Sequence, residues 1–207
     1  KGIGVTDTLK QILVSEHGKI SRFSQVAENM MTNSIQSIQL APEGIVTEIY
    51  PEKGNEAGKI DLIHDKDRGE VSRYARDNGV FTMQGPFELK QGGQGIAVRN
   101  PVYLENDDGE EVFWGFTIVI IRVPDIFADT VKALSDFGYD YRLSKNVSQR
   151  EETYEVISRS KGKLTDPVSY VFEMAGDRWK LEVMPRQGWF GSRSLYLVSL
   201  GGLLIVV

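Results

Sequence analysis

The sequence predicts an α+β fold in which a long N-terminal helix precedes two antiparallel β-sheets. Apolar residues recur every three or four positions over about the first 30 residues of the chain, the spacing of one helix face. Residues 112–123 are apolar at almost every position, which is typical of a buried strand. Several later segments alternate apolar and polar residues, as half-buried strands do. With 207 residues, the chain is long enough for two small domains.

The predicted helix covers residues 1–36. Its apolar row is Val5, Leu9, Ile12, Leu13, Ile20, Phe23, Val26, Met30 and Met31. A helix of about 30 residues extends about 45 Å, which suits a stalk that pairs with a second copy. A helix packed on its own domain has the same spacing, so both interpretations stay open.

The larger sheet is expected within residues 37–135. Its predicted strands are residues 38–40, 45–50, 80–83, 96–104 and 112–123. Residues 112–123 should be the central strand, covered on both faces. Residues 65–77 are expected to form a helix that ends at Asn78-Gly79. Pro124 is suitably placed to begin a helix that runs through Leu134.

A smaller sheet is expected within residues 136–190. Its predicted strands are residues 140–143, 153–158, 168–174 and 179–184. After it, residues 194–207 form a run of 14 residues without a charge. A membrane span needs about 20 apolar residues, so length alone favours a buried strand or core helix. Trp189, Phe190 and Arg193 are the types that flank membrane spans, and we expect residues 191–207 to begin a truncated transmembrane helix.

Composition excludes several classes of protein. The net charge of −5 comes from 24 basic and 29 acidic residues, without the basic stripe typical of nucleic-acid binding. Because cysteine is absent, disulfides and thiolate metal sites are excluded. The turn at residues 92–95 lacks the Lys-Ser/Thr of a phosphate-binding loop and joins two strands.

Catalytic chemistry has little support in this sequence. The two histidines are His17, on the predicted helix, and His64. His64 lies with Asp61, Asp65 and Asp67 in an acidic string that could hold a metal. That string lacks the regular oxygen spacing of a calcium loop, and a solvated loop with a helix start is the favoured interpretation. We therefore expect a non-catalytic chain without a cofactor.

Short motifs follow one another over residues 35–123. They are Gln39-Leu40-Ala41-Pro42 with Gly44-Ile45-Val46, Tyr50-Pro51 with Gly54-Asn55-Glu56, Gly85-Pro86-Phe87-Glu88-Leu89 with Gln91-Gly92-Gly93, and Arg99-Asn100-Pro101-Val102-Tyr103 followed by Phe113-Trp114-Gly115. In this order and spacing, they resemble the CHASE domain family. The resemblance implies an extracytoplasmic sensor at the cell membrane, ahead of a cytoplasmic histidine kinase or nucleotide cyclase. It also implies a stalk helix and two PAS-like subdomains, of which residues 37–135 are membrane-distal and bind the ligand, and residues 136–190 are membrane-proximal.

The resemblance also implies positions for the ligand site. These positions are Asp67, Gln84, Lys90, Arg99, Trp114 and Thr117, with Arg68 as the rival of Asp67 after a one-residue shift. The plant cytokinin-binding pattern has leucine near Lys90 and threonine near Arg99. Because two cations disfavour a flat apolar ligand and a buried arginine needs an anion or several acceptors, we expect a small anionic or carboxylate-bearing ligand.

Other roles stay open for three of these residues. Arg99 could pair with an acid inside the fold, Lys90 could be a solvated turn residue, and Trp114 could belong to the core alone. The expected partners are the small-molecule ligand, a second copy through the stalk helix, and the membrane as anchor. A protein-interaction module without a small-molecule ligand is the alternative function.

Overall fold

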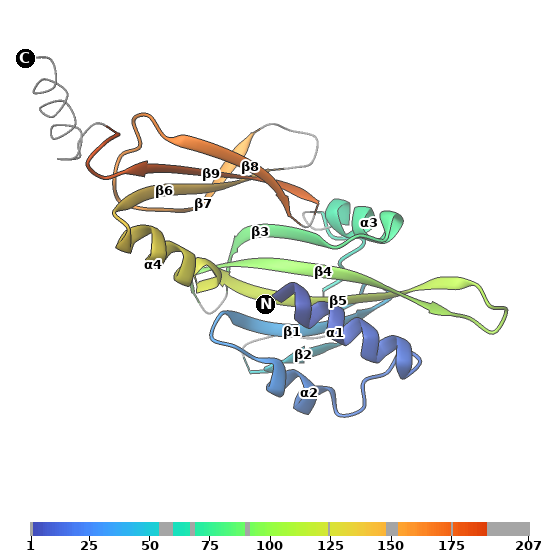
Figure 1. Cartoon of the computed structure of the whole chain (residues 1–207). Coiled ribbons are helices and arrows are strands. Elements are labelled where there is room, and N and C mark those ends of the chain that lie inside the picture. The colour runs from blue at the N-terminus through green and yellow to red at the C-terminus, as the bar shows by residue number, and fades with distance from the viewer. Residues whose placement is uncertain are drawn as a thin grey trace, which may run out of the picture. The chain divides into compact units, whose positions relative to one another are not determined.

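A computed structural model describes residues 2–53, 60–66, 69–89, 92–123, 125–147, 153–174 and 176–189. The chain divides into two compact units at Ile126 and Phe127, with Met174–Asp177 grouped with the first unit. Figure 1 shows a mixed α and β architecture with one antiparallel sheet in each unit. The predicted α+β class with two antiparallel sheets is therefore confirmed.

The first unit begins with two helices where we predicted one. They are α1 (Gly2–Ser15) and α2 (Phe23–Met30). His17, Gly18 and Arg22 have φ values of 52°, 86° and 60°, and this left-handed backbone ends a right-handed helix. The single helix of about 30 residues is therefore wrong. Apolar spacing continued across residues 16–22 because α2 resumes a buried face at Phe23.

The sheet of the first unit contains β1 to β5 in the order β2-β1-β5-β4-β3. Their bounds are β1 (Ile35–Pro42), β2 (Glu48–Tyr50), β3 (Thr82–Glu88), β4 (Gln94–Glu105) and β5 (Glu111–Val123). The central strand is β5, which pairs with β1 on one side and with β4 on the other. Residues 116–121 of β5 are buried, which confirms the predicted central strand.

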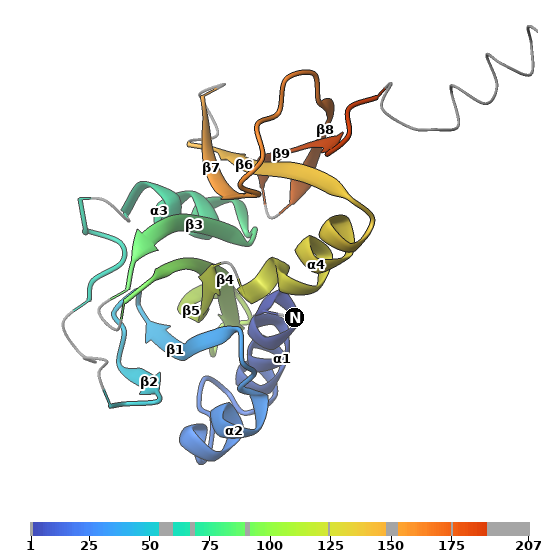
Figure 2. The ribbon, with the colours of Figure 1, turned by 90° about the vertical axis from the view of Figure 1, so that its left-hand side faces the viewer.

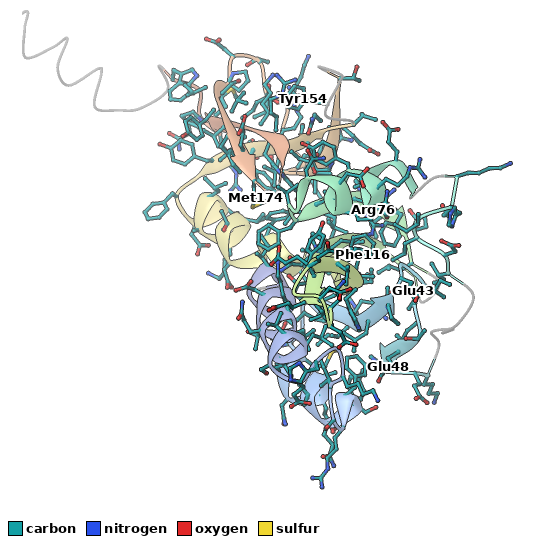
Figure 3. The ribbon with its side chains drawn as sticks, turned by 90° about the vertical axis from the view of Figure 1, so that its right-hand side faces the viewer. Glu43, Glu48, Arg76, Phe116, Tyr154 and Met174 are labelled. Carbon is teal, nitrogen blue, oxygen red and sulfur yellow. The ribbon has the colours of Figure 1, made fainter. Side chains whose placement is uncertain are left out.

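Helices cover both faces of this sheet (Figure 2). One face packs against α1, whose Leu9 and Leu13 are 0% exposed. The other is covered by α3 (Gly69–Asn78) and by residues that follow β1, and its buried cluster includes Phe116 and Ala75. Figure 3 shows Phe116 inside the first unit, with Glu43 and Glu48 at its outer edge. The predicted end of the middle helix at Asn78-Gly79 is confirmed, since α3 ends there and Gly79 has φ 65°.

A 3-10 turn at Asp125–Phe127 leads into α4 (Ala128–Asp136) of the second unit. The sheet of this unit has the strand order β7-β6-β9-β8. The strands are β6 (Tyr139–Asn146), β7 (Tyr154–Arg159), β8 (Val168–Met174) and β9 (Asp177–Pro185), which confirms the predicted four. Trp179 is 0% exposed and makes ring contacts with Phe127 and Phe172. Pro124, the expected start of the helix, lies outside the described residues.

Residues 191–207, the predicted start of a transmembrane helix, also lie outside the described residues. Among the helices within the described ranges, none is both long and apolar enough to cross a lipid bilayer.

Candidate functional site

The candidate site lies on the sheet face of the first unit that α3 covers. The pairing register places Gln39, Ile118, Arg99 and Thr82 in one row across β1, β5, β4 and β3. Side chains two positions apart on a strand share a face. Gln84 therefore lies on the same face as Arg99, because Gln84 pairs with Ala97 and Thr82 pairs with Arg99.

Arg99 and Gln84 are joined across β3 and β4. Arg99 is 2% exposed, and its Nη2 donates a 2.5 Å hydrogen bond to Oε1 of Gln84. A guanidinium carries five donors in a planar fork that matches a carboxylate. The structure thus brings together two of the predicted site residues and holds a cation within the protein interior.

Three further polar side chains share this face, and the sequence analysis did not identify them. Thr82 is 1% exposed, and its hydroxyl has no hydrogen-bond partner among the described residues. Gln39 donates a 3.0 Å hydrogen bond from Nε2 to Oγ of Ser37, and both residues are buried. Ser37 and Gln39 alternate with Ile38 and Leu40, and this period of two could have indicated a polar face.

Apolar residues pack around this polar row. The cluster on this face includes Ala97, Phe116, Ile118 and Ile120 from the sheet. It also includes Val46, Leu62, Ile63 and Ala75 from the covering segments. A polar group in such surroundings is poorly solvated, so hydrogen bonds and charges act there more strongly than at the surface. The arrangement can hold an acidic group through Arg99 and orient it through amide and hydroxyl groups.

Thr117 and Trp114 lie on the opposite face, which corrects our expectation of one cluster. Thr117 pairs with Asn100, one residue out of phase with Arg99, and its Oγ1 donates a 2.9 Å hydrogen bond to the main-chain oxygen of Thr6. Trp114 lies against Gly18, where an added Cβ would be 2.8 Å from its Nε1. Both side chains thus belong to the packing near the N-terminal helix.

Asp67, its rival Arg68 and Lys90 lie outside the described residues. Gly69 opens α3, and its main-chain nitrogen donates to the oxygen of Asp65. Gly92 lies in the turn between β3 and β4, where its main-chain nitrogen donates a hydrogen bond to the main-chain oxygen of Leu89. This turn joins two strands, as we predicted.

Asp61, in the acidic string around His64, is hydrogen bonded to the local backbone. Oδ1 of Asp61 accepts hydrogen bonds from the main-chain nitrogens of Ile63 and His64, at 3.0 and 3.1 Å. The ring Nδ1 of His64 lies 2.9 Å from Oδ2 of Asp61, and these contacts hold the pKa of Asp61 below its ordinary value. No group of three or more potential metal ligands occurs among the residues that the structure describes.

A separate groove of about 720 Å³ lies beside the C-terminal half of α1. Its walls include Lys10 and His17 from the helix side and Tyr103, Glu105 and Glu111 from the β4–β5 hairpin. It contains none of the predicted site residues, and its charges are of both signs.

Comparison with protein families then identifies the chain. The family model of the CHASE domain matches residues 14–171. The chain belongs to the CHASE domain family. CHASE is a sensory, non-catalytic domain, and this chain is accordingly an extracellular sensor domain. A search of curated proteins found no match to this chain.

Solved sensor domains have the same fold. An extracellular ligand-binding receptor from Desulfohalobium retbaense superposes with a TM-score of 0.57 at 13% identity, over 86% of this chain. This CHASE chain spans 35% of the length of that receptor. The ligand-binding domain of the Pseudomonas aeruginosa amino acid chemoreceptor PctC, in complex with GABA, gives a TM-score of 0.54 at 13% identity. That match covers 87% of this chain and 90% of the PctC domain.

Proposed function

We propose that this CHASE domain is the extracytoplasmic small-molecule sensor of a transmembrane receptor whose output is a cytoplasmic histidine kinase or nucleotide cyclase. The first unit, which ends at Ile126, is the membrane-distal PAS-like subdomain that binds the ligand, and the second unit, which begins at Phe127, is the membrane-proximal one. The family match and the fold shared with extracellular receptor domains support this proposal.

One observation carries the assignment of the ligand site. Arg99 is buried on the sheet face beneath α3 and is hydrogen bonded to Gln84. It lies next to Thr82, whose hydroxyl has no hydrogen-bond partner within the described part of the chain. A buried guanidinium favours an anionic partner, and bidentate pairing with a carboxylate is its strongest contact. The proposed ligand is therefore a small carboxylate-bearing molecule. The PctC domain supports this class, because GABA, the ligand of its complex, carries a carboxylate.

The proposed site also includes Asp67 and Lys90, as the resemblance to the family implies. In this proposal, Lys90 adds a second cation for the ligand, and Asp67 orients a donor group of the same ligand. Trp114 and Thr117 serve the other side of the sheet, where they link the ligand-binding strands to the N-terminal helices.

The signal passes from the sheet to α1 in this proposal. The buried bond between Thr117 and Thr6 makes α1 move with the central strand. Two copies pair through their N-terminal helices, and residues 191–207 begin the membrane anchor. Ligand binding shifts the population between two arrangements of the dimer, which requires a different ligand affinity for each arrangement.

A thermal-shift screen of amino acids and small carboxylates tests the proposal. A ligand that binds the native state raises the melting temperature with concentration. The shift should be lost in Arg99→Ala and reduced in Gln84→Ala. Gln84→Ala keeps the test interpretable if Arg99→Ala fails to fold. Lys10→Ala changes the separate groove and should leave the shift intact. A ligand whose shift survives Arg99→Ala and Gln84→Ala would contradict this site.

The alternative, a protein-interaction module, has one observation in its favour. The β4–β5 hairpin extends beyond its neighbours, because β1 ends at Pro42 opposite Gly115 and β3 begins at Thr82 opposite Arg99 (Figure 1). Strands with open edges can pair with another chain. Shortening the tip at residues 106–109 to a two-residue turn would abolish such binding and leave a small-molecule response intact.

A further inference from the structure

One end of the second unit carries exposed apolar side chains. Phe137 lies between α4 and β6 and is 81% exposed, and Val168, the first residue of β8, is 56% exposed. Trp189 is 38% exposed and follows β9. Isolated exposed apolar residues are ordinary on a protein surface. Here, three of them share one end of a small sheet, and that grouping indicates a partner surface.

The pairing register and loop contacts place these residues at the same end. Tyr139 opens β6 and pairs with Pro185 at the end of β9. The main-chain nitrogen of Arg186 donates to the oxygen of Gly138 at 2.9 Å, which brings the segment after β9 to the turn of Phe137. The indole nitrogen of Trp189 donates to the main-chain oxygen of Asp166 at 2.7 Å. Figure 1 shows the α4–β6 turn and the end of β9 at this end of the unit.

Basic side chains belong to the same end. Lys161 and Lys163 are exposed in the loop that follows β7. The main-chain nitrogen of Ser160, the first residue of this loop, donates a 3.0 Å hydrogen bond to the main-chain oxygen of Tyr141 in β6. Two nearby carboxylates already face cations of the unit: Asp136 lies 2.5 Å from Lys132, and Asp140 lies 3.5 Å from Arg186. Asp166 is the exposed acid in the same loop as the two lysines.

The sequence that follows Trp189 indicates what this surface meets. Residues 194–207 contain no charge, and Arg193 precedes them. Aromatic and basic residues are enriched where a chain enters the lipid interface, and polybasic segments are attracted to anionic lipids. A lipid bilayer offers both an apolar layer for Phe137, Val168 and Trp189 and a charged headgroup layer for the lysines.

We propose that this end of the second unit binds directly to the headgroup region of a lipid bilayer. Phe137 and Val168 insert at the interface, Trp189 marks the headgroup level, and Lys161 and Lys163 bind lipid phosphates. This inference rests on the proposed function, because it requires a chain that enters the membrane after Trp189. It adds that the folded unit touches the membrane and that its orientation on the membrane is fixed.

The chain has no cysteine, so single-cysteine labelling can test the contact in the full 207-residue chain. Phe137→Cys and Val168→Cys each receive an environment-sensitive fluorophore, and Val147→Cys is the control. Val147 is 53% exposed and follows β6 at the opposite end of the sheet from Phe137. The labelled chains are mixed with vesicles of phosphatidylcholine, with or without phosphatidylglycerol, that contain nitroxide-labelled headgroups.

The proposal predicts blue-shifted, nitroxide-quenched emission at positions 137 and 168 and unchanged emission at position 147, with a stronger effect on anionic vesicles. If the chain binds vesicles but label 137 behaves like label 147, this inference fails and the proposed membrane anchor stands. A chain that does not bind vesicles overturns the inference. A blue shift that depends on protein concentration without lipid indicates a second copy as partner and overturns the lipid contact.

Discussion

The hydroxyl of Thr117 donates a 2.9 Å hydrogen bond to the main-chain oxygen of Thr6, 111 residues earlier in the chain. Both residues are 0% exposed. The bond fastens the central strand β5 to α1 on the sheet face that Arg99 does not occupy. The face proposed to bind the ligand, which α3 covers, and the face that α1 covers are thus opposite faces of one sheet.

Thr117→Val tests this division of faces. The change keeps the shape of the side chain and removes one buried hydrogen bond, so we expect a loss of about 0.5–1.5 kcal/mol in the free energy of unfolding. Ligand affinity should be unchanged. Thr8→Val is the control, because Thr8 is exposed on α1 and bonds within its helix, and such surface changes stay within about 0.5 kcal/mol. A weaker ligand response with unchanged stability would place Thr117 in the site instead.

Gly18→Ala tests whether the N-terminal helix ends before residue 18. Gly18 has φ 86°, and an added Cβ would lie 2.8 Å from Nε1 of Trp114 and 2.9 Å from Cδ1 of Leu104. We expect a loss of about 1–3 kcal/mol in urea denaturation. In a continuous helix, the same change would instead stabilise the fold by about 1 kcal/mol. Gly4→Ala in α1 meets no atom within 4 Å and should stabilise the protein, which makes it the matched control.

Acid should weaken the second unit through Glu182. Its carboxylate accepts two hydrogen bonds from Arg142 on the neighbouring strand, at 2.6 and 2.8 Å, and these hold the pKa of Glu182 below its ordinary value. Because the folded pKa lies below the unfolded one, the pair stabilises the fold above the unfolded value of about 4.3. That stability is lost as the pH falls through the folded pKa.

Glu182→Gln should therefore lower stability at pH 7 by about 1.5–3 kcal/mol, nearer the lower value because Arg142 is 41% exposed. It should also flatten the dependence of the melting temperature on pH below about pH 5, where the wild-type carboxylate begins to be protonated in the unfolded state. Glu155→Gln changes an exposed carboxylate on β7 and serves as the control. Parallel pH curves for the wild type and Glu182→Gln would contradict the role of this pair.

Patterns of burial made much of the fold predictable. Residues 112–123 are apolar on both faces, which indicated the central strand because such a segment needs cover on each side. The alternation in the last third located the strands of the second sheet. The break between α1 and α2 was missed because the apolar spacing persists across it. The break depends on residues with a left-handed backbone conformation. Two of them, His17 and Arg22, are of types that do not signal that conformation in a sequence.

The candidate site was only partly predictable, for a reason of register. The resemblance placed Gln84, Arg99 and Thr117 in one ligand site, whereas in the structure Gln84 and Arg99 are hydrogen bonded to each other and Thr117 lies on the opposite face. Arg99 pairs with Ile118 and not with Thr117, and a shift of one residue moves a side chain to the other face of a sheet. Register between distant strands depends on tertiary pairing, which spacing along one strand does not reveal.

The charge preference of the ligand site tests the central claim most directly. We would take a carboxylate ligand found in the thermal-shift screen and its primary amide. Calorimetry would measure the affinity of both compounds for the wild type and for Arg99→Gln. The wild type should prefer the carboxylate by about tenfold to a hundredfold, and Arg99→Gln should lose that preference. If folded Arg99→Gln retains the full preference for the carboxylate, Arg99 does not bind the ligand and the proposed site is wrong.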